Sequence, residues 1–244
     1  MIKHIVISGG ATSGVSMISM LKTLNENKFY NYNNIETLWG TSAGSIIIVL
    51  LALNLEWNSI YTYITERPWD KILTIHPTNL LESYTKKGLL CSYDLAKKFF
   101  IPLFKTKDIN IDITMRQFYE LTKIKIFIFS TSVNQLESVN FSYLSHPDME
   151  VMRAVSLSSA IPFVFKPIMY ENNYYCDGGL VNNFPLLNCV NYIKEKKKDI
   201  KTFEKEILGI TGIIDGDVDP ENLKESDNIF QYFMHIIYKF IDKS

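Results

Sequence analysis

The sequence predicts an α/β fold: a three-layer α/β/α domain with a mainly parallel central sheet. Between residues 2 and 54, two short β-rich runs alternate with two segments of helical character, and a glycine-rich break follows each run. Strand, helix, strand and helix in this order are typical of a parallel sheet with helices packed on both faces. The chain of 244 residues is 47% hydrophobic and 21% charged, which is enough apolar material for one buried core. We therefore expect residues 1–244 to form a single domain.

Each element at the start of the chain has its own signal. Residues 2–8 form a short apolar run rich in β-branched side chains, which predicts the first strand. After a glycine pair, apolar residues recur at the spacing of one helix face, at Val15, Ile18, Leu21 and Leu24. Residues 35–39 predict a second strand. Residues 45–54 are apolar on all sides, which favours a buried helix over a strand.

The later segments complete the predicted sheet. Residues 56–122 are expected to form a mostly helical, amphipathic insertion, with turn signals at Arg67-Pro68, His76-Pro77 and Lys87-Gly88. The remaining strands are predicted at residues 125–130, 138–143, 174–176 and 207–214. The remaining helices are predicted at residues 149–158 and, near the C-terminus, 228–241.

Residues 40–44 read Gly-Thr-Ser-Ala-Gly and lie between the second predicted strand and the helix after it. In this context the pattern predicts a nucleophile elbow, a strained turn that presents the hydroxyl of Ser42. Gly40 and Gly44 suit such a turn, because the flanking strand and helix would otherwise collide. The amide of Ala43 at the helix start can help to hold an oxyanion. The alternative is a turn without chemistry, because so short a pattern also arises by chance.

Residues 9–14, Gly-Gly-Ala-Thr-Ser-Gly, form a second glycine-rich break between a strand and a helix. Backbone of this kind can direct N–H groups at an anion. A nucleotide phosphate is one candidate, but the lysine that a phosphate-binding loop needs is replaced by Val15. The other candidate is the tetrahedral oxyanion formed when a serine attacks an ester. Since the second parallel strand usually neighbours the first, we expect the elbow beside this loop; a mere tight turn is the remaining interpretation.

A nucleophilic serine also needs a base. None of the four histidines (His4, His76, His146 and His235) cleanly ends a late strand, where the histidine of a catalytic triad is expected. Asp177 instead follows a short apolar strand and precedes Gly178 and Gly179, so a carboxylate leaves a strand end into a tight turn. Partial burial there would raise the pKa of the carboxyl and make it a better proton acceptor at neutral pH. The residues alone leave Asp177 open between a base and a turn-forming aspartate.

Several short motifs follow one another along the chain: Ser8-Gly9-Gly10 with Gly14, Gly-Thr-Ser-Ala-Gly at 40–44, Ser158-Ser159-Ala160-Ile161-Pro162, Asp177-Gly178-Gly179 and Asn183-Phe184-Pro185. In this order, over about residues 4–215, they resemble the patatin-like phospholipase family. The resemblance implies that Ser42 is the nucleophile and Asp177 the base of a two-residue dyad without histidine. It implies further that the backbone of Gly9, Gly10 and Ala11 forms the oxyanion hole. It also implies a lipid acyl hydrolase that needs no metal or other cofactor.

The first loop departs from the family's pattern at two positions. Members usually have a third glycine where this chain has Ala11, and an arginine or lysine where it has Ser13. Alanine retains its N–H, so an oxyanion hole is still expected. The missing cation is expected to affect the preference for phospholipid over neutral ester more than it affects hydrolysis itself.

The sequence thus predicts a serine carboxylic-ester hydrolase of the phospholipase A or lysophospholipase type, which works through an acyl-enzyme on Ser42. An α/β-hydrolase with a Ser-Asp-His triad is the alternative among enzymes, with His235 as the late histidine. That fold normally places several strands before its elbow, whereas one strand and a glycine loop precede the strand at residues 35–39 here. A catalytically idle lipid-binding protein is the alternative outside enzymes, and the intact dyad counts against it.

Composition and charge narrow the expected partners. The formal net charge of −1 gives no electrostatic reason to expect nucleic acid. The longest apolar run, residues 46–53, is far short of the ~20 residues that span a bilayer, so no transmembrane segment is expected. The start of the chain shows no signal-peptide pattern and the three cysteines lack metal-ligand spacing, which favours a cytoplasmic protein, peripheral at membranes, without a metal. The expected partner is a phospholipid or other acyl-ester lipid at a membrane or micelle surface; the sequence carries no signal for an oligomeric state.

Overall fold

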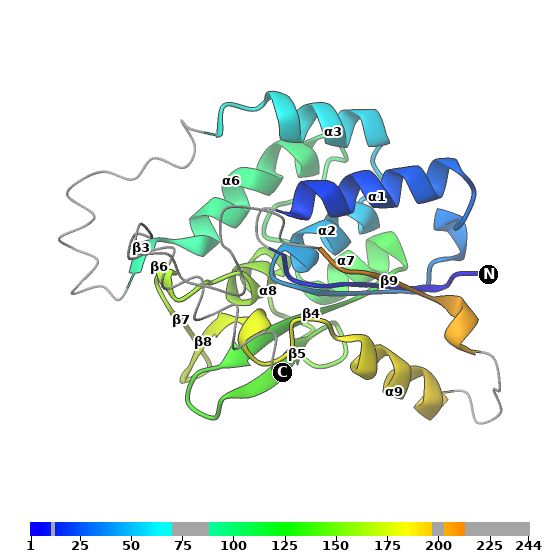
Figure 1. Ribbon diagram of the computed structural model, residues 1–244. Helices are drawn as coiled ribbons and strands as arrows, with labels where there is room; N and C mark the ends of the chain where they lie inside the picture. Colours follow the sequence, from blue (N-terminus) through cyan, green and yellow to red (C-terminus); the bar gives the residue numbers. More distant parts are fainter. Residues whose placement is uncertain (11–12, 70–87, 197–202, 213–244) are drawn as a thin grey trace, which may run out of the picture.

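The protein has a central β-sheet with helices packed against both of its faces (Figure 1). The structure is a computed structural model that describes residues 1–10, 13–69, 88–196 and 203–212. The strands are β1 (His4–Ile7), β2 (Thr37–Thr41), β3 (Gly88–Leu90), β4 (Lys125–Ser132), β5 (Glu137–Phe141), β6 (Phe163–Phe165), β7 (Ile168–Tyr170), β8 (Asn173–Asp177) and β9 (Ile207–Ile210). The helices are α1 (Gly14–Glu26), α2 (Ala43–Ala52), α3 (Trp57–Glu66), α6 (Ser92–Lys105), α7 (Met115–Thr122), α8 (Val151–Ser158) and α9 (Leu186–Lys196).

The main sheet is parallel in its centre and antiparallel at one side. Its strand order is β7-β8-β4-β2-β1-β9, with β5 also paired to β4. β1 is parallel to both β2 and β9, and β2 is parallel to β4. β5 and β8 run antiparallel to β4, and β7 antiparallel to β8. The predicted α/β fold with a parallel centre to its sheet is confirmed, and the side formed by β5, β8 and β7 is antiparallel.

The larger core lies between one face of the sheet and the helices above it in Figure 1. Ile5 and Ile7 of β1 and Leu38 of β2 point to this face, as the alternation of side chains along a strand requires. α2 packs on β1 and β2 from this side and is covered in turn by α1. Because it has neighbours on opposite sides, α2 is buried around its circumference, which explains a helix that is apolar on all sides.

The opposite face of the sheet carries a smaller, aromatic core. Val6, Trp39 and Phe127 point to this face, and the rings of Trp39 and Phe127 are stacked with centroids 3.8 Å apart. Cys189 and Ile193 of α9 close the core from below. α9 was not predicted as an element of the fold. It supplies the third layer of the expected α/β/α arrangement.

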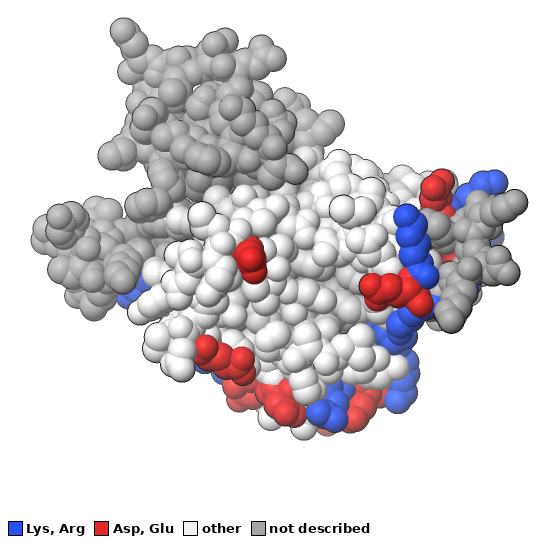
Figure 2. Space-filling model, turned by 90° about the horizontal axis from the view of Figure 1, so that it is seen from below, with Lys and Arg blue, Asp and Glu red and all other residues white. Residues whose placement is uncertain are grey.

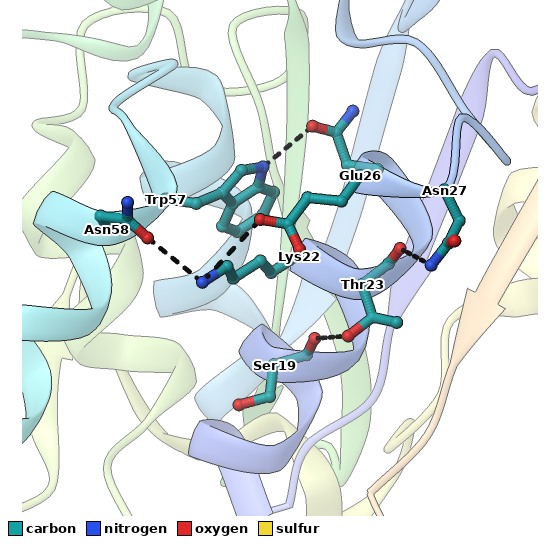
Figure 3. A network of polar contacts seen from close by, with 8 residues as sticks. Ser19, Lys22, Thr23, Glu26, Asn27, Trp57 and Asn58 are labelled. Atoms are coloured by element: carbon teal, nitrogen blue, oxygen red, sulfur yellow. Dashed lines mark hydrogen bonds and ion pairs between the residues drawn. The ribbon is translucent and has the colours of Figure 1, made fainter.

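The segment at residues 56–122 is mostly helical where the structure describes it, and it includes one short strand. It contains α3, α6 and α7, and β3 pairs in parallel with β6 to form a separate two-stranded sheet. Figure 3 shows how α3 is tied to α1: Lys22 of α1 reaches Asn58, with Nζ 3.2 Å from Oδ1. Beside it, the indole of Trp57 donates to Oδ1 of Asn25 at 2.9 Å. The insertion is therefore attached to the helix that follows the first glycine-rich loop.

Several predicted boundaries change in the structure. β2 begins two residues later than predicted and runs up to the elbow, because residues 37–41 pair with β4. The last described strand ends at Ile210, and the helix predicted at residues 228–241 lies outside the described residues. Across the described ranges, no helix combines the length and hydropathy needed to cross a membrane.

The surface below the sheet carries no extended patch of one charge. Figure 2 shows that most of the described surface on this side is uncharged. Most of the acidic and basic side chains in view lie toward one side and along the lower rim, and one acidic group stands alone near the middle of the face. This distribution gives no strong field of one sign over the face in view.

Candidate active site

Ser42 occupies a strained turn between β2 and α2. β2 ends at Thr41, α2 begins at Ala43, and Ser42 between them has φ 52° and ψ −120°. A residue other than glycine in such a conformation costs on the order of 1–3 kcal/mol. The surrounding structure must therefore hold the turn. A strand, a strained turn and a helix form the context predicted for an elbow at residues 40–44.

The two glycines of the motif allow this turn because they have no side chain. A Cβ on Gly40 would lie 2.5 Å from the carbonyl oxygen of Gly44. A Cβ on Gly44 would lie 2.7 Å from the carbonyl oxygen of Ser8, at the end of β1. Backbone atoms cannot move aside as a flexible side chain could. The sequence argument that strand and helix would otherwise collide is confirmed at Gly40, whereas at Gly44 the close neighbour is the backbone at the end of β1.

The ends of β2 and β8 meet along one edge of β4. The first part of β4 pairs with β2 and the last part with β8, while β5 occupies the opposite edge. Thr41 is paired with Phe129, and Asp177 is paired with the next residue of β4, Ser130. Ser42 and Asp177 are 135 positions apart in the chain, and this register makes them neighbours.

A short hydrogen bond joins the two predicted dyad residues. The hydroxyl of Ser42 donates to Oδ2 of Asp177 at 2.6 Å. The other carboxylate oxygen, Oδ1, accepts from the amide of Gly179 at 2.8 Å, in the short 3₁₀ turn at Gly178–Leu180. Ser42 and Asp177 are each only 7% exposed. The Asp-Gly-Gly turn thus orients the carboxylate and leaves one oxygen for the serine.

Burial makes Asp177 a stronger proton acceptor than an ordinary aspartate. Removal from water raises the pKa of Asp177 from 3.8 to about 6, although the hydrogen bonds from Ser42 and Gly179 lower it in part. At pH 7 the carboxyl is still mostly ionised, so it can accept a proton. A pKa close to the working pH is what efficient general-base catalysis requires.

The loop after Asp177 ties the elbow to the first glycine-rich loop. The hydroxyl of Thr41 donates to the carbonyl of Asn182 at 2.9 Å, and the amide of Gly9 donates to the carbonyl of Asn183 at 3.0 Å. The second bond corrects the expectation for Gly9, whose N–H is used within the fold and is not free for an oxyanion. The Asn-Phe-Pro motif therefore holds the glycine loop, a role that spacing along the chain could not reveal.

The glycine loop lies beside the serine, as the adjacency of the first two strands predicted. A Cβ on Gly9 would be 3.2 Å from the Cβ of Ser42. Ala43 is the first residue of α2, where backbone amides have no acceptor within the helix. Gly10 and Ala43 thus remain as candidate oxyanion donors. Ala11 lies outside the described residues.

An apolar cavity of about 560 Å³ adjoins Ser42. Its wall comes from α1, α2, α3, α6 and α8 together with the segment around Ile161. Phe99 and Phe100 of α6 lie on this wall, as does Ile64 of α3. The amphipathic pattern of residues 56–122 predicted buried apolar faces, and α3 and α6 turn such faces toward this cavity. A space of this size and character suits an apolar ligand.

The described histidines have other surroundings. His4 shares a hydrogen bond with a buried threonine of β2, and His146 packs against the ring of Phe141, where burial lowers its pKa. His76 and His235 lie outside the described residues. In the part of the chain that the structure describes, no group of three or more His, Cys, Asp or Glu side chains is placed to hold a metal ion.

The chain is similar to known proteins over most of its length. Residues 5–190 match the family described as patatin-like phospholipase. A probable lipid hydrolase of Invertebrate iridescent virus 6, 463L, is 33% identical over 198 residues, which cover 80% of this chain and 66% of that protein. An uncharacterized protein of Acanthamoeba polyphaga mimivirus, R571, is 28% identical over 185 residues, with 76% and 60% covered. The chain thus spans 60–66% of the length of these two relatives.

A solved structure shows a similar fold. VipD from Legionella pneumophila superposes with a TM-score of 0.58 at 18% sequence identity, over 86% of this chain and 49% of that chain. At this identity the likeness concerns the fold, and it agrees with the mixed α/β architecture described above.

Asp177→Asn is expected to stabilise the protein at alkaline pH. The folded state raises the pKa of Asp177, so the folded protein binds more protons than the unfolded chain between pH 3.8 and about 6. The cost of the buried charge is absent at low pH, grows as pH rises through this window and is complete above it. Asp177→Asn should therefore raise the free energy of unfolding above that of the wild type. This gain should be larger at pH 8 than at pH 4, by on the order of 3 kcal/mol.

Urea denaturation of both proteins at pH 4, 6 and 8 measures this difference. Asp148→Asn is the matched control, because the side chain of Asp148 is 90% exposed, and it should show no comparable gain. A difference between wild type and Asp177→Asn that stays constant with pH would contradict a destabilising buried carboxylate.

Proposed function

The chain belongs to the patatin-like phospholipase family, and from this premise we propose that it is a lipid acyl hydrolase that cleaves fatty-acyl esters. One contact carries the proposal: the hydroxyl of Ser42 lies 2.6 Å from the carboxylate of Asp177, at a strained elbow beside an apolar cavity. The arrangement combines a nucleophile that lines the cavity, a base with a raised pKa and room for an acyl chain.

In the proposed reaction, Ser42 and Asp177 act as a dyad. Oγ of Ser42 attacks the ester carbonyl while Asp177 accepts the hydroxyl proton. The tetrahedral oxyanion is held by backbone amides, for which Gly10, Ala11 and Ala43 are the proposed donors. Collapse of this intermediate expels the alcohol, which takes the proton from Asp177, and leaves the fatty acyl group on Ser42. Water, deprotonated by Asp177, then attacks the acyl-enzyme, and the proton returns to Ser42 as the fatty acid leaves.

The proposed substrate is a phospholipid or lysophospholipid presented by a membrane or micelle. The cavity beside Ser42 is lined almost wholly by apolar side chains and would take the acyl chain. Helices of the insertion, α3 and α6, contribute much of its wall and would cover the site from the lipid side. We further propose that residues 1–244 form one acyl hydrolase domain with this insertion, without metal or other cofactor.

Ser42 is expected to be the covalent nucleophile. An alkyl fluorophosphonate should label the wild-type protein, and peptide mass spectrometry should place the adduct on Ser42, because its hydroxyl is activated by Asp177. Ser42→Ala should remain unlabelled, whereas Ser156→Ala, at a buried serine of α8 whose hydroxyl donates within its own helix, should still react. An adduct on another serine would contradict the dyad, and no adduct on the folded wild type would favour the idle lipid-binding alternative.

Asp177 is expected to be the sole side-chain base. Asp177→Asn should lower turnover of an ester substrate by about 10²–10⁴-fold, the usual contribution of a general base. The wild-type kcat/KM should rise with pH through about 6, because Asp177 must lose its proton to act. His235→Ala tests the triad alternative and should leave turnover nearly unchanged. A large loss in His235→Ala with little change in Asp177→Asn would assign the protein to the triad mechanism.

Hydrolysis is expected to be faster at a lipid surface. A short-chain phospholipid can be assayed below and above its critical micelle concentration, with released fatty acid as the readout. Rates should rise severalfold where micelles form, because the acyl chain must enter an apolar cavity next to the insertion helices. The same rate per molecule in both forms would indicate an esterase that acts on dispersed substrates.

A further inference from the structure

A buried serine outside the dyad holds the backbone of Ser42. Ser158 is the last residue of α8 and is fully buried. Its hydroxyl accepts a hydrogen bond from the amide of Ser42 at 2.9 Å and donates one to the carbonyl of Phe129 on β4 at 2.5 Å. A single oxygen thus connects the elbow, α8 and the centre of the sheet.

The position of this oxygen is explained by the end of the ladder between β2 and β4. Thr41 and Phe129 form the last pair of that ladder, after which β2 turns away at Ser42. In a continuing parallel ladder, the next amide of β2 would bond to a carbonyl of β4. Here the amide of Ser42 and the carbonyl of Phe129 are joined instead through the hydroxyl of Ser158. The bridge satisfies both groups while the backbone leaves the sheet.

The same short segment also holds Asp177. Two residues beyond Ser158, the carbonyl of Ala160 accepts the amide of Asp177 at 2.9 Å. The segment is anchored in turn by Ser130 of β4, whose hydroxyl lies 2.9 Å from the carbonyl of Leu157 and 2.8 Å from that of Cys176. Each of these carbonyls belongs to the residue just before Ser158 or Asp177. Both members of the dyad are therefore placed relative to one segment.

We propose that Ser158 is a positioning residue for Ser42: its hydroxyl holds the nucleophile in the strained conformation that directs Oγ to Asp177. The inference rests on the proposed function of the dyad and goes beyond it, because Ser158 touches neither the carboxylate nor the cavity. Without this hydroxyl, a buried amide and a buried carbonyl lose their partner, and the strain at Ser42 favours a relaxed turn. A small shift of Oγ is enough to weaken its attack and its hydrogen bond to Asp177.

Ser158→Ala is the test, with Ser156→Ala as the matched control. Ser156 lies in the same helix and is equally buried, but its hydroxyl donates within that helix, to the carbonyl of Arg153 at 2.7 Å. Ser158→Ala should lower kcat, and the rate of fluorophosphonate labelling at Ser42, by about 10- to 100-fold with KM changed less than twofold. Ser156→Ala should leave both rates within about twofold of wild type.

The pH profile separates positioning from a general loss of folded protein. Donation from Ser42 lowers the pKa of Asp177 in the wild type, so a displaced hydroxyl should move the acid limb of kcat/KM to higher pH in Ser158→Ala. A smaller folded fraction would scale the whole profile and leave the limb in place. If Ser158→Ala does not fold, Ser158→Cys, which keeps a weak hydrogen-bonding group at this position, takes its place and should show a loss of rate and a shift of the acid limb in the same directions.

The outcomes distinguish this inference from the function on which it rests. An active wild type whose Ser158 variants match Ser156→Ala in rate and in pH profile would overturn the positioning role alone. A reduced rate with an unmoved acid limb would likewise overturn it and indicate a structural role. A folded wild type that neither hydrolyses lipid esters nor reacts at Ser42 would overturn the proposed function, and the inference with it.

Discussion

The meeting of β2 and β8 on the same edge of β4 is the constraint on which the rest of the site depends. Two strands cannot occupy one stretch of an edge, so β2 must leave the sheet where β8 arrives. The chain turns sharply at Ser42 for this reason, and the carboxylate of Asp177 arrives beside the serine hydroxyl. The helix after the turn must then pass close over β1, where only glycine fits at position 44. Strain, close packing and the hydrogen bond between the two side chains are consequences of one junction.

This junction combines features that oppose folding with features that offset them. The positive φ of Ser42 and the buried charge of Asp177 each raise the free energy of the folded state. Apolar packing on both faces of the sheet compensates, including the stacked rings of Trp39 and Phe127 directly below the parallel strands. The helical insertion adds more than stability, because it turns the space above Ser42 into an apolar cavity. A carboxylate in such surroundings stays a strong proton acceptor, since little water competes for it.

The sequence by itself determined the features that depend on near neighbours in the chain. The strand, glycine-flanked serine and apolar helix at residues 37–52 follow from local pattern, and the structure agrees within two residues at each end. The small residue at position 40 follows from the local geometry of the strand-turn-helix unit, whereas the neighbour that excludes a side chain at position 44 is β1, which only the packed sheet supplies. Asp177 was ambiguous on composition alone. The order of motifs along the whole chain, and its resemblance to a family, distinguished it from other aspartates in turns.

Only the tertiary structure decided which distant groups meet. Three features join residues that no spacing rule connects. They are the hydrogen bond from the Gly9 amide to Asn183, the bridge from Ser158 to Ser42, and the cavity to which α6 contributes. Ser158 and Ser42 are 116 positions apart, and their contact depends on the register of β4 with two other strands. The layer formed by α9 was missed for a related reason, since its short apolar face has meaning only against Trp39 and Phe127. Periodicity indicates that a face is buried, whereas the partner against which it is buried is chosen by the packing of the whole sheet.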